Sequence, residues 1–580
     1  MTSALHAFPH ALPRALGRVL PPRAALALVL AGSAASVAST FLPWTWTAKF
    51  PGDLTVAGYP GGNQVITLTL GLVTLVFGAA ACGVRPLARL VPRGSAQALR
   101  GLAFAQAAST WYVLAAIAVE LGGLANWVAG SWVAAVATLL PLAGALALPD
   151  DRREAPPGGG LPRPAEIAIL FVLMLGAMLV VDWGLATEHT QQFVGYVLAL
   201  GFAAWGVNRS GLLEEISGVS ARNRVATSLA ALVAAVAFAF VQDGDAYLSL
   251  AANILIFGAV ALGLNIVVGL SGLLDLGYVA FLGVGAYVAA LVSGSVFSRY
   301  AGTPLPFWAA VLIGIAVAVL AGVLIGAPTL RVRGDYLAIV TLGFGEIFRI
   351  LVNNLDGTSG PRVTNGPNGV PGVPDLSLFG YDFGETHQVL GFTLGRFANY
   401  YLLLVGVIAV VVFVFSRVND SRIGRAWVAI REDETAAAAM GVNGFRLKLL
   451  AFALGAALAG LAGTVQAHVT TTVTPDQYQF LATAPPNSAF LLAAVVLGGM
   501  GTISGPLLGG ALLYVIPEKF EFFDDKQLLL FGLTLILMMR LRPEGLVPNR
   551  RRRLEFHEEE IAEAEGHDVA TRTAPAGVKA

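Results

Sequence analysis

The sequence predicts an all-α protein: a polytopic bundle of transmembrane helices, with broken or re-entrant helices in its second half. Three observations predict this fold class. Of the 580 residues, 56% are hydrophobic and only 12% are charged, and the mean hydropathy is +0.72. Soluble domains carry about twice that share of charged residues. Apolar runs recur along most of the chain, and a glycine-rich stretch interrupts the run near the C-terminal end.

A helix needs about 20 apolar residues to cross the hydrocarbon core of a bilayer. The runs that approach this length are Arg23–Leu42, Gln64–Val84, Gly101–Val119, Val128–Leu148, Ala165–Val181, Thr190–Val207, Val225–Val241, Ala246–Leu270, Gly277–Phe297, Pro306–Ala327, Tyr336–Val352, Tyr400–Ser416 and Leu447–Ala467, followed by a short run, Leu528–Met539. Between the last two, Asn487–Pro517 is too short for two full crossings and a turn. We expect two half-helices there that meet at a glycine break, which a membrane tolerates where protein or water surrounds it.

Positive charges are retained in the cytoplasm, so they orient the chain. They gather in alternate connections, at Arg14, Arg18 and Arg23; Arg85, Arg89, Arg93 and Arg100; Arg152, Arg153 and Arg163; Arg209, Arg222 and Arg224; Arg331 and Arg333; Arg417 to Lys448; and Arg540 to Arg553. The other connections hold only Lys49, Arg299, Arg362, Arg396, Lys519 and Lys526. The pattern predicts a multi-pass protein with both termini in the cytoplasm, and a first helix that is retained rather than cleaved as a signal peptide.

Three regions follow from composition. Residues 1–245 hold additional N-terminal transmembrane helices with few polar residues. Residues 246–548 hold the helices with distinctive Gly, Asn, Asp and Glu patterns, and residues 549–580 form a charged cytoplasmic tail. The linker Pro149–Pro164, with its Pro-Pro-Gly-Gly-Gly stretch, is typical of a flexible connection.

Several function classes are disfavoured. The net charge is zero, which gives no electrostatic basis for binding nucleic acid. Cys82 is the single cysteine, so an intramolecular disulfide and a cysteine-based metal cluster are excluded. None of the lysines follows a Gly-x-x-x-x-Gly pattern, so the chain lacks the phosphate-binding loop of an ATPase. The histidines show no metal-binding spacing. We therefore expect no enzyme, no catalytic residues, no metal and no cofactor in this chain.

One cytoplasmic connection contains a short helix that suits a docking role. Asp433 or Glu434 fits a helix N-terminus, the alanines that follow favour helix, and Gly441 is a natural stop. The small side chains allow another backbone to approach closely. The predicted docking residues are Glu434, Ala436, Ala437 and Gly441. The alternative is an ordinary amphipathic connector.

Two segments contain candidates for a solute path. In Asn265–Tyr287, one span ends and another begins among glycines, with Asn265, Ser271, Asp275 and Gly277 as candidates. Helix ends near such a break can bind a charged substrate, although the glycines also suit plain helix packing.

In Leu330–Arg349, the candidates are Thr341 and Glu346. Glu346 lies about 16 Å along a helix from Asp335, near mid-membrane, where an ionisable group is a functional candidate. Alternatively, Glu346 only pairs with Arg349, or both residues lie at the outer interface. The glycine break adds Gly498, Gly499 and Gly501.

These motifs resemble a known family. Glu434-Thr435-Ala436-Ala437-(x)3-Gly441 is similar to the "EAA" coupling loop of bacterial ABC importer permeases, with Thr435 in place of the first alanine. The segment Phe445–Phe452, the two path segments and Val496–Pro506 resemble the branched-chain amino acid permeases of the LivM/LivH type. The resemblance covers about residues 246–548.

The resemblance implies a bacterial inner-membrane subunit that acts with ABC ATPase subunits, a second permease chain and an extracytoplasmic solute-binding protein, with ATP used by the partner. The substrate would be branched-chain amino acids first, with urea, short amides or other amino acids as alternatives. The long loop Asn353–Asn399 is then a landing surface for the binding protein, or a mobile linker. Two other functions stay open: a secondary transporter driven by an ion gradient, which would use Glu346 with Asp275, and a non-transporting membrane scaffold.

Overall fold

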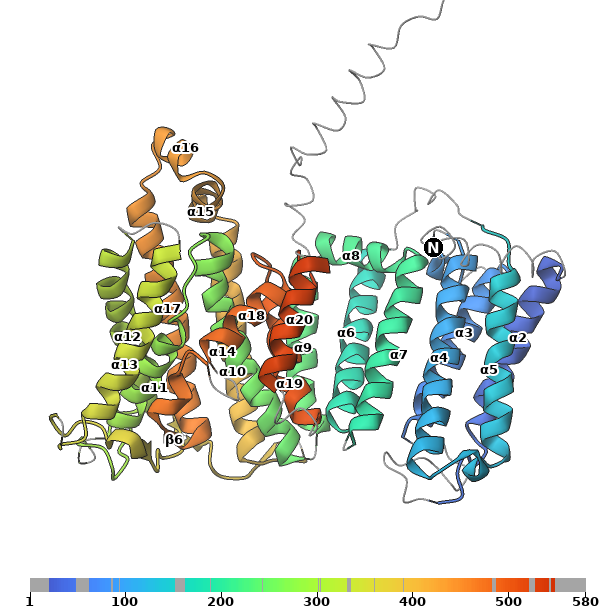
Figure 1. Cartoon of the computed structure of the whole chain (residues 1–580), viewed down its shortest axis with the longest axis horizontal. Helices are drawn as coiled ribbons and strands as arrows, with labels where there is room; N and C mark the ends of the chain where they lie inside the picture. Colours follow the sequence, from blue (N-terminus) through green and yellow to red (C-terminus); the bar gives the residue numbers. More distant parts are fainter. Residues whose placement is uncertain are drawn as a thin grey trace, which may run out of the picture. The chain divides into compact units, whose positions relative to one another are not determined.

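The computed structural model describes residues 20–47, 62–84, 87–92, 94–151, 162–187, 189–242, 244–300, 302, 304–330, 335–358, 360–389, 391–481, 487–520, 527–541 and 544–547. Its contacts divide the chain into two compact units, Met1–Phe238 and Ala239–Ala580, which we call unit 1 and unit 2 (Figure 1). The described residues include 11 helices long and apolar enough to span a membrane. The predicted polytopic helical bundle is confirmed. The charged tail 549–580, Arg331, Arg333 and most of the linker 149–164 lie outside the described residues.

The helices of unit 1 are α2 (Pro22–Ser39), α3 (Gln64–Ala81), α4 (Ala96–Glu120), α5 (Ala129–Ala147), α6 (Arg163–Leu185), α7 (Thr190–Arg209), α8 (Leu212–Arg222) and α9 (Arg224–Val241), with short 3-10 turns η1 (Ala88–Leu90) and η2 (Leu124–Asn126). Helix α9 ends just past the boundary between the units. Helices α2, α3, α4, α5 and α7 pack against one another. Small residues permit this: a Cβ on Gly144 of α5 would lie 2.6 Å from the Ala25 carbonyl oxygen of α2.

Neutral polar side chains lie buried between the helices of unit 1. The Gln106 amide of α4 donates to the Ser36 hydroxyl of α2. The hydroxyls of Thr67 on α3 and Thr110 on α4 are 2.8 Å apart and hydrogen-bonded. All four residues are fully buried. Composition alone indicated few polar residues here; those that are present bind the helices together, which is a known use of uncharged polar groups in lipid.

Helix α8 was not predicted as a separate element. Its 11 residues place Glu214 and Glu215 in the first turn and Arg222 in the last, so acidic and basic groups match the helix dipole. Glu166 of α6 holds its C-terminal end, accepting hydrogen bonds from Arg222 Nη2 at 2.9 Å and from Asn223 Nδ2 at 2.7 Å. At 11 residues, α8 is too short to cross a membrane.

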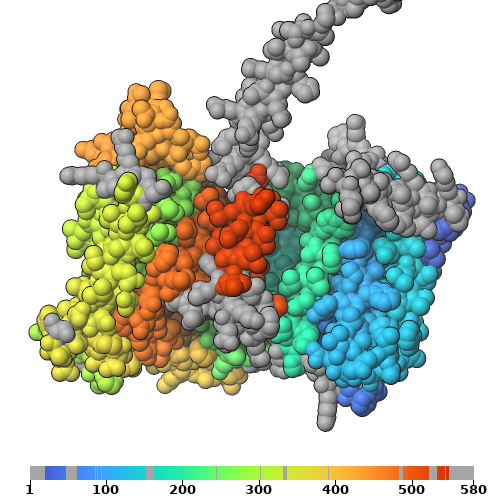
Figure 2. All heavy atoms as spheres, viewed as in Figure 1, coloured from blue at the N-terminus to red at the C-terminus, as the bar shows by residue number. Residues whose placement is uncertain are grey.

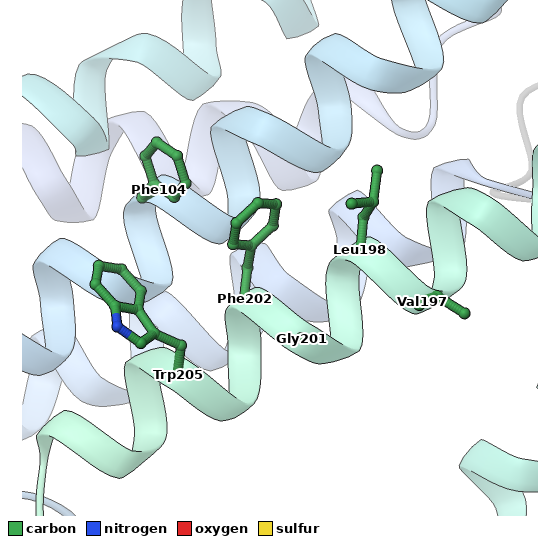
Figure 3. A pocket seen from close by; sticks show the side chains of 6 residues that line it. All are labelled: Phe104, Val197, Leu198, Gly201, Phe202 and Trp205. Carbon is green, nitrogen blue, oxygen red and sulfur yellow. The ribbon is translucent and has the colours of Figure 1, made fainter. Parts of the chain in front are cut away.

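Unit 1 also has an open apolar groove of about 410 Å³ on its surface (Figure 3). The groove lies along α7 and is closed on one side by α4. Its lining is Phe104, Val197, Leu198, Gly201, Phe202 and Trp205. None of these side chains is charged, so the groove suits hydrocarbon contact rather than a polar solute.

The helices of unit 2 are α10 (Asp245–Asn265), η3 (Ile266–Leu270, a π-helical turn), α11 (Val279–Val292), α12 (Phe307–Thr329), α13 (Asp335–Asn354), α14 (Arg396–Asn419), α15 (Arg422–Glu432), α16 (Glu434–Ala439), α17 (Gly444–Thr470), α18 (Ser488–Gly498), α19 (Ser504–Lys519) and α20 (Gln527–Leu541), with 3-10 turns η4 (Gly366–Asn368) and η5 (Pro475–Tyr478). The described residues also form six short strands: β1 (Val370–Pro371), β2 (Ser377–Leu378), β3 (Tyr381–Asp382), β4 (His387–Val389), β5 (Phe392–Leu394) and β6 (Thr472–Val473). These strands form three antiparallel pairs, β1–β6, β2–β3 and β4–β5.

Helix α10 is at the centre of unit 2. It packs against α14, α17, α18 and α19. Within Asp245–Leu270, 83% of the residues in an apolar stretch of 18 are buried. Around it, α11, α12 and α17 meet through small residues. A Cβ on Gly460 of α17 would lie 2.6 Å from the Ala318 Cβ of α12, and a Cβ on Gly285 of α11 would overlap the Gly460 carbonyl. Only small residues allow three helices to pack this closely in lipid.

The predicted glycine break between two half-helices is confirmed. Helices α18 and α19 are antiparallel, because Gly498 contacts Gly505 near the break while Gly509 contacts Ala494 further from it. They form a hairpin whose apex is Gly499–Ile503. Helix α11, by contrast, is shorter than the predicted run Gly277–Phe297, because residues 277–278 before it and 293–297 after it are not helical.

The long loop after α13 is folded in its described part. Strand β1 pairs with β6, so the loop is tied to the chain after α17. Asp375 Oδ1 accepts hydrogen bonds from Arg396 Nε and from the Tyr400 hydroxyl, both at 2.8 Å. His468 Nδ1 lies 2.8 Å from the Pro374 carbonyl oxygen. These contacts favour a fixed surface over a mobile linker for this segment.

Candidate coupling element and helix break

Helices α15 and α16 form a protruding element, which lies beyond the ends of α12, α13 and α14 (Figure 1) and stands out at the surface in orange (Figure 2). We call residues 422–441 the coupling element. Ser421 Oγ caps α15, accepting from Ile423 N and Gly424 N. Asp433 Oδ1 caps α16, accepting from Thr435 N at 2.8 Å and Ala436 N at 2.9 Å. Two capping side chains therefore set where α15 and α16 begin.

A few side chains anchor the coupling element to the core of unit 2. Trp427 and Ile430 of α15 and Ala437 of α16 are buried. The Trp427 indole donates to the Leu447 carbonyl oxygen at 2.7 Å, at the start of α17. Lys448 Nζ lies 2.7 Å from Glu434 Oε1, which joins α17 to α16. The element is thus held to a membrane-spanning helix through both of its helices.

The predicted docking residues divide between two faces. Glu434, Ala436 and Gly441 are exposed, whereas Ala437 is buried against the core. Gly441 has φ +84° and no heavy atom near its missing Cβ, so it serves the turn rather than a close contact. Met440 is 85% exposed. The accessible surface of α16 and the turn after it therefore consists of small side chains, Met440 and the Glu434 carboxylate, while α15 adds charged side chains at Arg422, Arg425 and Glu432.

Most of the predicted path residues lie at two places where the helices are broken, the hairpin apex and the non-helical segment before α11. Asn265 ends α10, and its side chain reaches the apex of the α18–α19 hairpin. Its Oδ1 accepts from Gly501 N at 2.8 Å, and its Nδ2 donates to the Thr502 carbonyl oxygen at 2.7 Å. Asn265 is fully buried. One amide side chain thus satisfies two backbone groups that the glycine break leaves without helical partners.

The three glycines at the break serve different needs. A Cβ on Gly498, the last residue of α18, would overlap the Gly505 carbonyl oxygen, and a Cβ on Gly499 would overlap that of Val547. Gly499 and Gly501 have φ values of +122° and +76°, which favour glycine. The chain after α20 returns to the end of α18, where Leu546 N and Val547 N donate to the carbonyls of Leu497 and Gly498, each at 2.8 Å. Returning backbone therefore binds the end of α18, and the Asn265 side chain binds the apex.

Asp275, Gly277 and Thr341 meet where the non-helical segment before α11 contacts α13. Asp275 Oδ1 accepts from Gly277 N at 2.9 Å, and the Thr341 hydroxyl accepts from Leu276 N at 3.0 Å. A Cβ on Gly277 would overlap the Thr341 carbonyl oxygen. Thr341 donates its hydroxyl proton to Ala338 O, and Asp275 Oδ2 has no hydrogen-bond partner among the described residues. Asp275 is 1% exposed, so this is a buried carboxylate oxygen with unused capacity.

Two further predicted path residues have local hydrogen-bond partners. Ser271, which follows the π-helical turn, donates its hydroxyl to the Val267 carbonyl oxygen at 2.7 Å. Glu346 Oε2 accepts from Arg349 Nε at 2.9 Å, which is the i,i+3 pair named as an alternative. Arg349 also lies 3.7 Å from Asp476 of η5. No described contact joins Glu346 to Asp275, the pair that an ion-driven transporter was expected to use.

Sequence reasoning missed Arg431, which links the coupling element to the helix break. Its Nη1 donates to the Gly269 carbonyl oxygen at 2.8 Å. The available signal was weak, because Arg431 is one of several positive charges in a cytoplasmic connection. Among the residues that the structure describes, no group of three His, Cys, Asp or Glu side chains could hold a metal ion.

The fold and the site define a multi-pass membrane permease. Comparison with known families then identifies it. Residues 246–539, half of the chain, match the model of the branched-chain amino acid transport system permease component, and the chain belongs to this family. No solved structure matches.

Individual relatives agree. The chain is 40% identical over 359 residues to the high-affinity branched-chain amino acid transport system permease protein LivM of Escherichia coli K12, covering 60% of this chain and 80% of that protein. It is 24% identical over 318 residues to a probable LivM of Methanocaldococcus jannaschii, covering 50% and 83%. It is 25% identical over 297 residues to the permease protein LivH of Salmonella typhimurium, covering 50% and 91%.

Proposed function

We propose that this permease is the translocation subunit of an ATP-driven importer for branched-chain amino acids or similar small solutes. A separate ATPase would dock on the coupling element, and a second permease chain would complete the path. The observation that carries the proposal is the exposed α16 surface of small residues in an element that is fixed to α17 through Trp427 and Lys448. The names of the relatives support the substrate class.

In this proposal, the coupling element faces the cytoplasm, as do both termini, and the membrane is the bacterial cytoplasmic membrane. The folded loop after α13 then lies on the opposite side, where it would receive a solute-binding protein. The chain itself acts as a conduit rather than as an enzyme, and ATP is bound and hydrolysed by the partner.

The path would pass the two breaks. Asn265, Gly498, Gly499 and Gly501 shape the apex, while Asp275, Gly277 and Thr341 shape the second break. Asp275 Oδ2 is a buried oxygen without a hydrogen-bond partner among the described residues, so it could accept the ammonium group of an amino acid. Ser271 and Glu346 would border the path, because their side chains already bond to Val267 O and Arg349.

Uptake by the reconstituted complex tests the proposal. Glu434→Lys puts a second positive charge beside Lys448 at the docking surface. We expect uptake to fall at least about 30-fold, the loss that goes with about 2 kcal/mol at an interface hot spot, with normal membrane insertion. Glu215→Lys, an exposed carboxylate of α8, is the matched control and should transport normally.

A second arm of the same experiment addresses the path. Asp275→Asn keeps the side-chain shape and removes the charge, so uptake should fall while the ATPase still copurifies. Nucleotide-free uptake by the wild-type complex, or full uptake by Glu434→Lys, would contradict the importer proposal. Full uptake by Asp275→Asn would contradict only the role of Asp275.

A further inference from the structure

We propose that Arg431 is a positioning residue that carries the movement of the coupling element to the hairpin apex, through the Gly269 carbonyl and Asn265. This inference rests on the proposed docking of an ATPase on the coupling element, and it goes further by naming the internal connection. Docking alone would move α15 and α16. To change the path, that movement has to reach the helix breaks through contacts that are rigid enough to transmit it.

The first contact is made by the Arg431 side chain at the last turn of α15. Its Nη1 donates to the Gly269 carbonyl oxygen at 2.8 Å. Glu432 Oε1 accepts from Nη2 at 2.6 Å and from Nε at 3.1 Å, which fixes the plane of the guanidinium group. The guanidinium group is planar and presents its donors in a fixed arrangement, whereas a lysine ammonium lies on a flexible stem. Arg431 is therefore better suited than a lysine to keep its hydrogen bonds when α15 moves.

The Arg431 stem adds a steric contact beside this hydrogen bond. Gly272 has φ +72°, and a Cβ there would lie 2.5 Å from Arg431 Cγ. The chain after the π-helical turn therefore lies directly on the aliphatic part of the arginine. A displacement of α15 toward the membrane would press on Gly272, and a displacement away would pull on the Gly269 carbonyl.

The second contact begins at the same glycine. A Cβ on Gly269 would lie 2.6 Å from Gly501 N and would overlap Asn265 Oδ1. Asn265 in turn binds Gly501 N and the Thr502 carbonyl. Gly269 thus contacts both parts: its carbonyl oxygen accepts a hydrogen bond from Arg431, and its Cα packs against Asn265 and Gly501 at the hairpin apex. Gly269 belongs to a π-helical turn. Such turns are rare in proteins, and those that occur are often at functional sites.

The connection consists of few parts. Arg431, Gly269 and Asn265 join α15, the π-helical turn and the hairpin apex, which are far apart in sequence. Each joint is a hydrogen bond or a backbone contact at a glycine, and the one side chain between the arginine and the apex is the short, doubly bonded amide of Asn265. If the coupling element and the apex share two arrangements, this connection is the physical link through which one sets the other.

The test measures how many solute molecules are taken up per ATP hydrolysed by the complete complex in proteoliposomes. Arg431→Ala removes the hydrogen bond and the stem contact. We expect the ATPase to copurify and hydrolyse ATP, while uptake per ATP falls at least about fivefold, the lower end of measured coupling between sites. Arg431→Lys keeps a positive donor and should recover part of the loss.

Arg417→Ala is the matched control. Arg417 lies in the last turn of α14, outside the coupling element, with its guanidinium over the Phe413 ring at 5.2 Å. It should leave uptake per ATP unchanged. The double variant Arg431→Ala with Asn265→Leu checks the second contact: in one connection, the pair should be no worse than the poorer single variant.

Three results would overturn the inference. Uptake per ATP within twofold of wild type in Arg431→Ala would show that the link is not needed. Loss of the copurifying ATPase in that variant would assign Arg431 to docking instead. Additive losses in the double variant would separate Arg431 from Asn265. Uptake that needs no ATPase at all would instead refute the importer proposal, which keeps the two failures distinct.

Discussion

Units 1 and 2 both pack their helices through small residues, and particular buried polar contacts in the two units differ in kind. In unit 1, Gln106 binds Ser36 and Thr67 binds Thr110, side chain to side chain between helices that continue past the contact. In unit 2, Asn265 binds backbone groups at the hairpin apex, where the chain leaves the helix, and the Tyr278 hydroxyl binds Gly455 O at 2.7 Å.

The difference shows where the helical backbone is interrupted inside an apolar bundle. A side-chain pair between two intact helices adds adhesion and leaves the helices as they are. A side chain that binds exposed backbone permits a break, and breaks are the places where a membrane bundle can bind or pass a polar solute. Unit 2 has the family match, the two breaks and the coupling element.

The largest expected effect comes from closing the break sterically. Gly498→Val would force side-chain atoms into the Gly505 carbonyl, so the α18–α19 hairpin could not form as observed. We expect a loss of about 3 kcal/mol or more, at or beyond the upper range for overpacked cores, seen as a lower thermal midpoint and poor yield in detergent.

Gly406→Val in α14 is the control for this prediction. Nothing lies within 4 Å of a Cβ at Gly406, so valine there should be neutral. Equal destabilisation by the two variants would mean that steric closeness at the apex is not what glycine provides.

A smaller effect should separate the two kinds of polar contact. Asn265→Leu leaves Gly501 N and the Thr502 carbonyl without their partner, which costs about 1–3 kcal/mol for each buried group. Gln106→Leu removes one bond to Ser36, and interhelical side-chain bonds in membranes average about 0.6 kcal/mol. Thermal unfolding of both variants measures the ratio. A larger loss for Gln106→Leu would reverse the distinction between the units.

The smallest predicted effect is a pH dependence in unit 1. Burial raises the pKa of Asp151, but hydrogen bonds from the Ser95 hydroxyl, Ser95 N and Ala96 N outweigh it and leave the pKa below 3.8. A lowered pKa means that the carboxylate stabilises the fold above about pH 4 and loses this effect as the pH falls through the folded-state pKa.

Asp151→Asn should therefore reduce stability by about 0.5–1 kcal/mol at neutral pH, the range for a helix cap. The difference from wild type should shrink below pH 4. Unfolding curves at pH 7 and pH 3.5 measure it, and a difference that grows in acid would contradict the assigned sign.

Much of the fold could be predicted because each transmembrane helix is an apolar run. The hairpin could be predicted because its glycines interrupt an apolar run that is too short for two full crossings and a turn. The short helix α16 was predicted because capping residues and alanines act locally, whereas α15 before it was not predicted as a separate helix. The connection from Arg431 to Gly269, and from Asn265 to Gly501, could not be, since it joins residues 162 and 236 positions apart. Helix α8 was missed because its 11 residues are too few to register as a span.

The segment after α20 that returns to the end of α18 limits how far the protein can be truncated at its C-terminal end. Leu546 N and Val547 N supply donors for the Leu497 and Gly498 carbonyls at the end of α18, in an apolar interior. A protein shortened to residue 541 keeps every helix that the structure describes and still removes these donors. An affinity tag or fluorescent fusion therefore belongs beyond residue 547, where it leaves this closure in place.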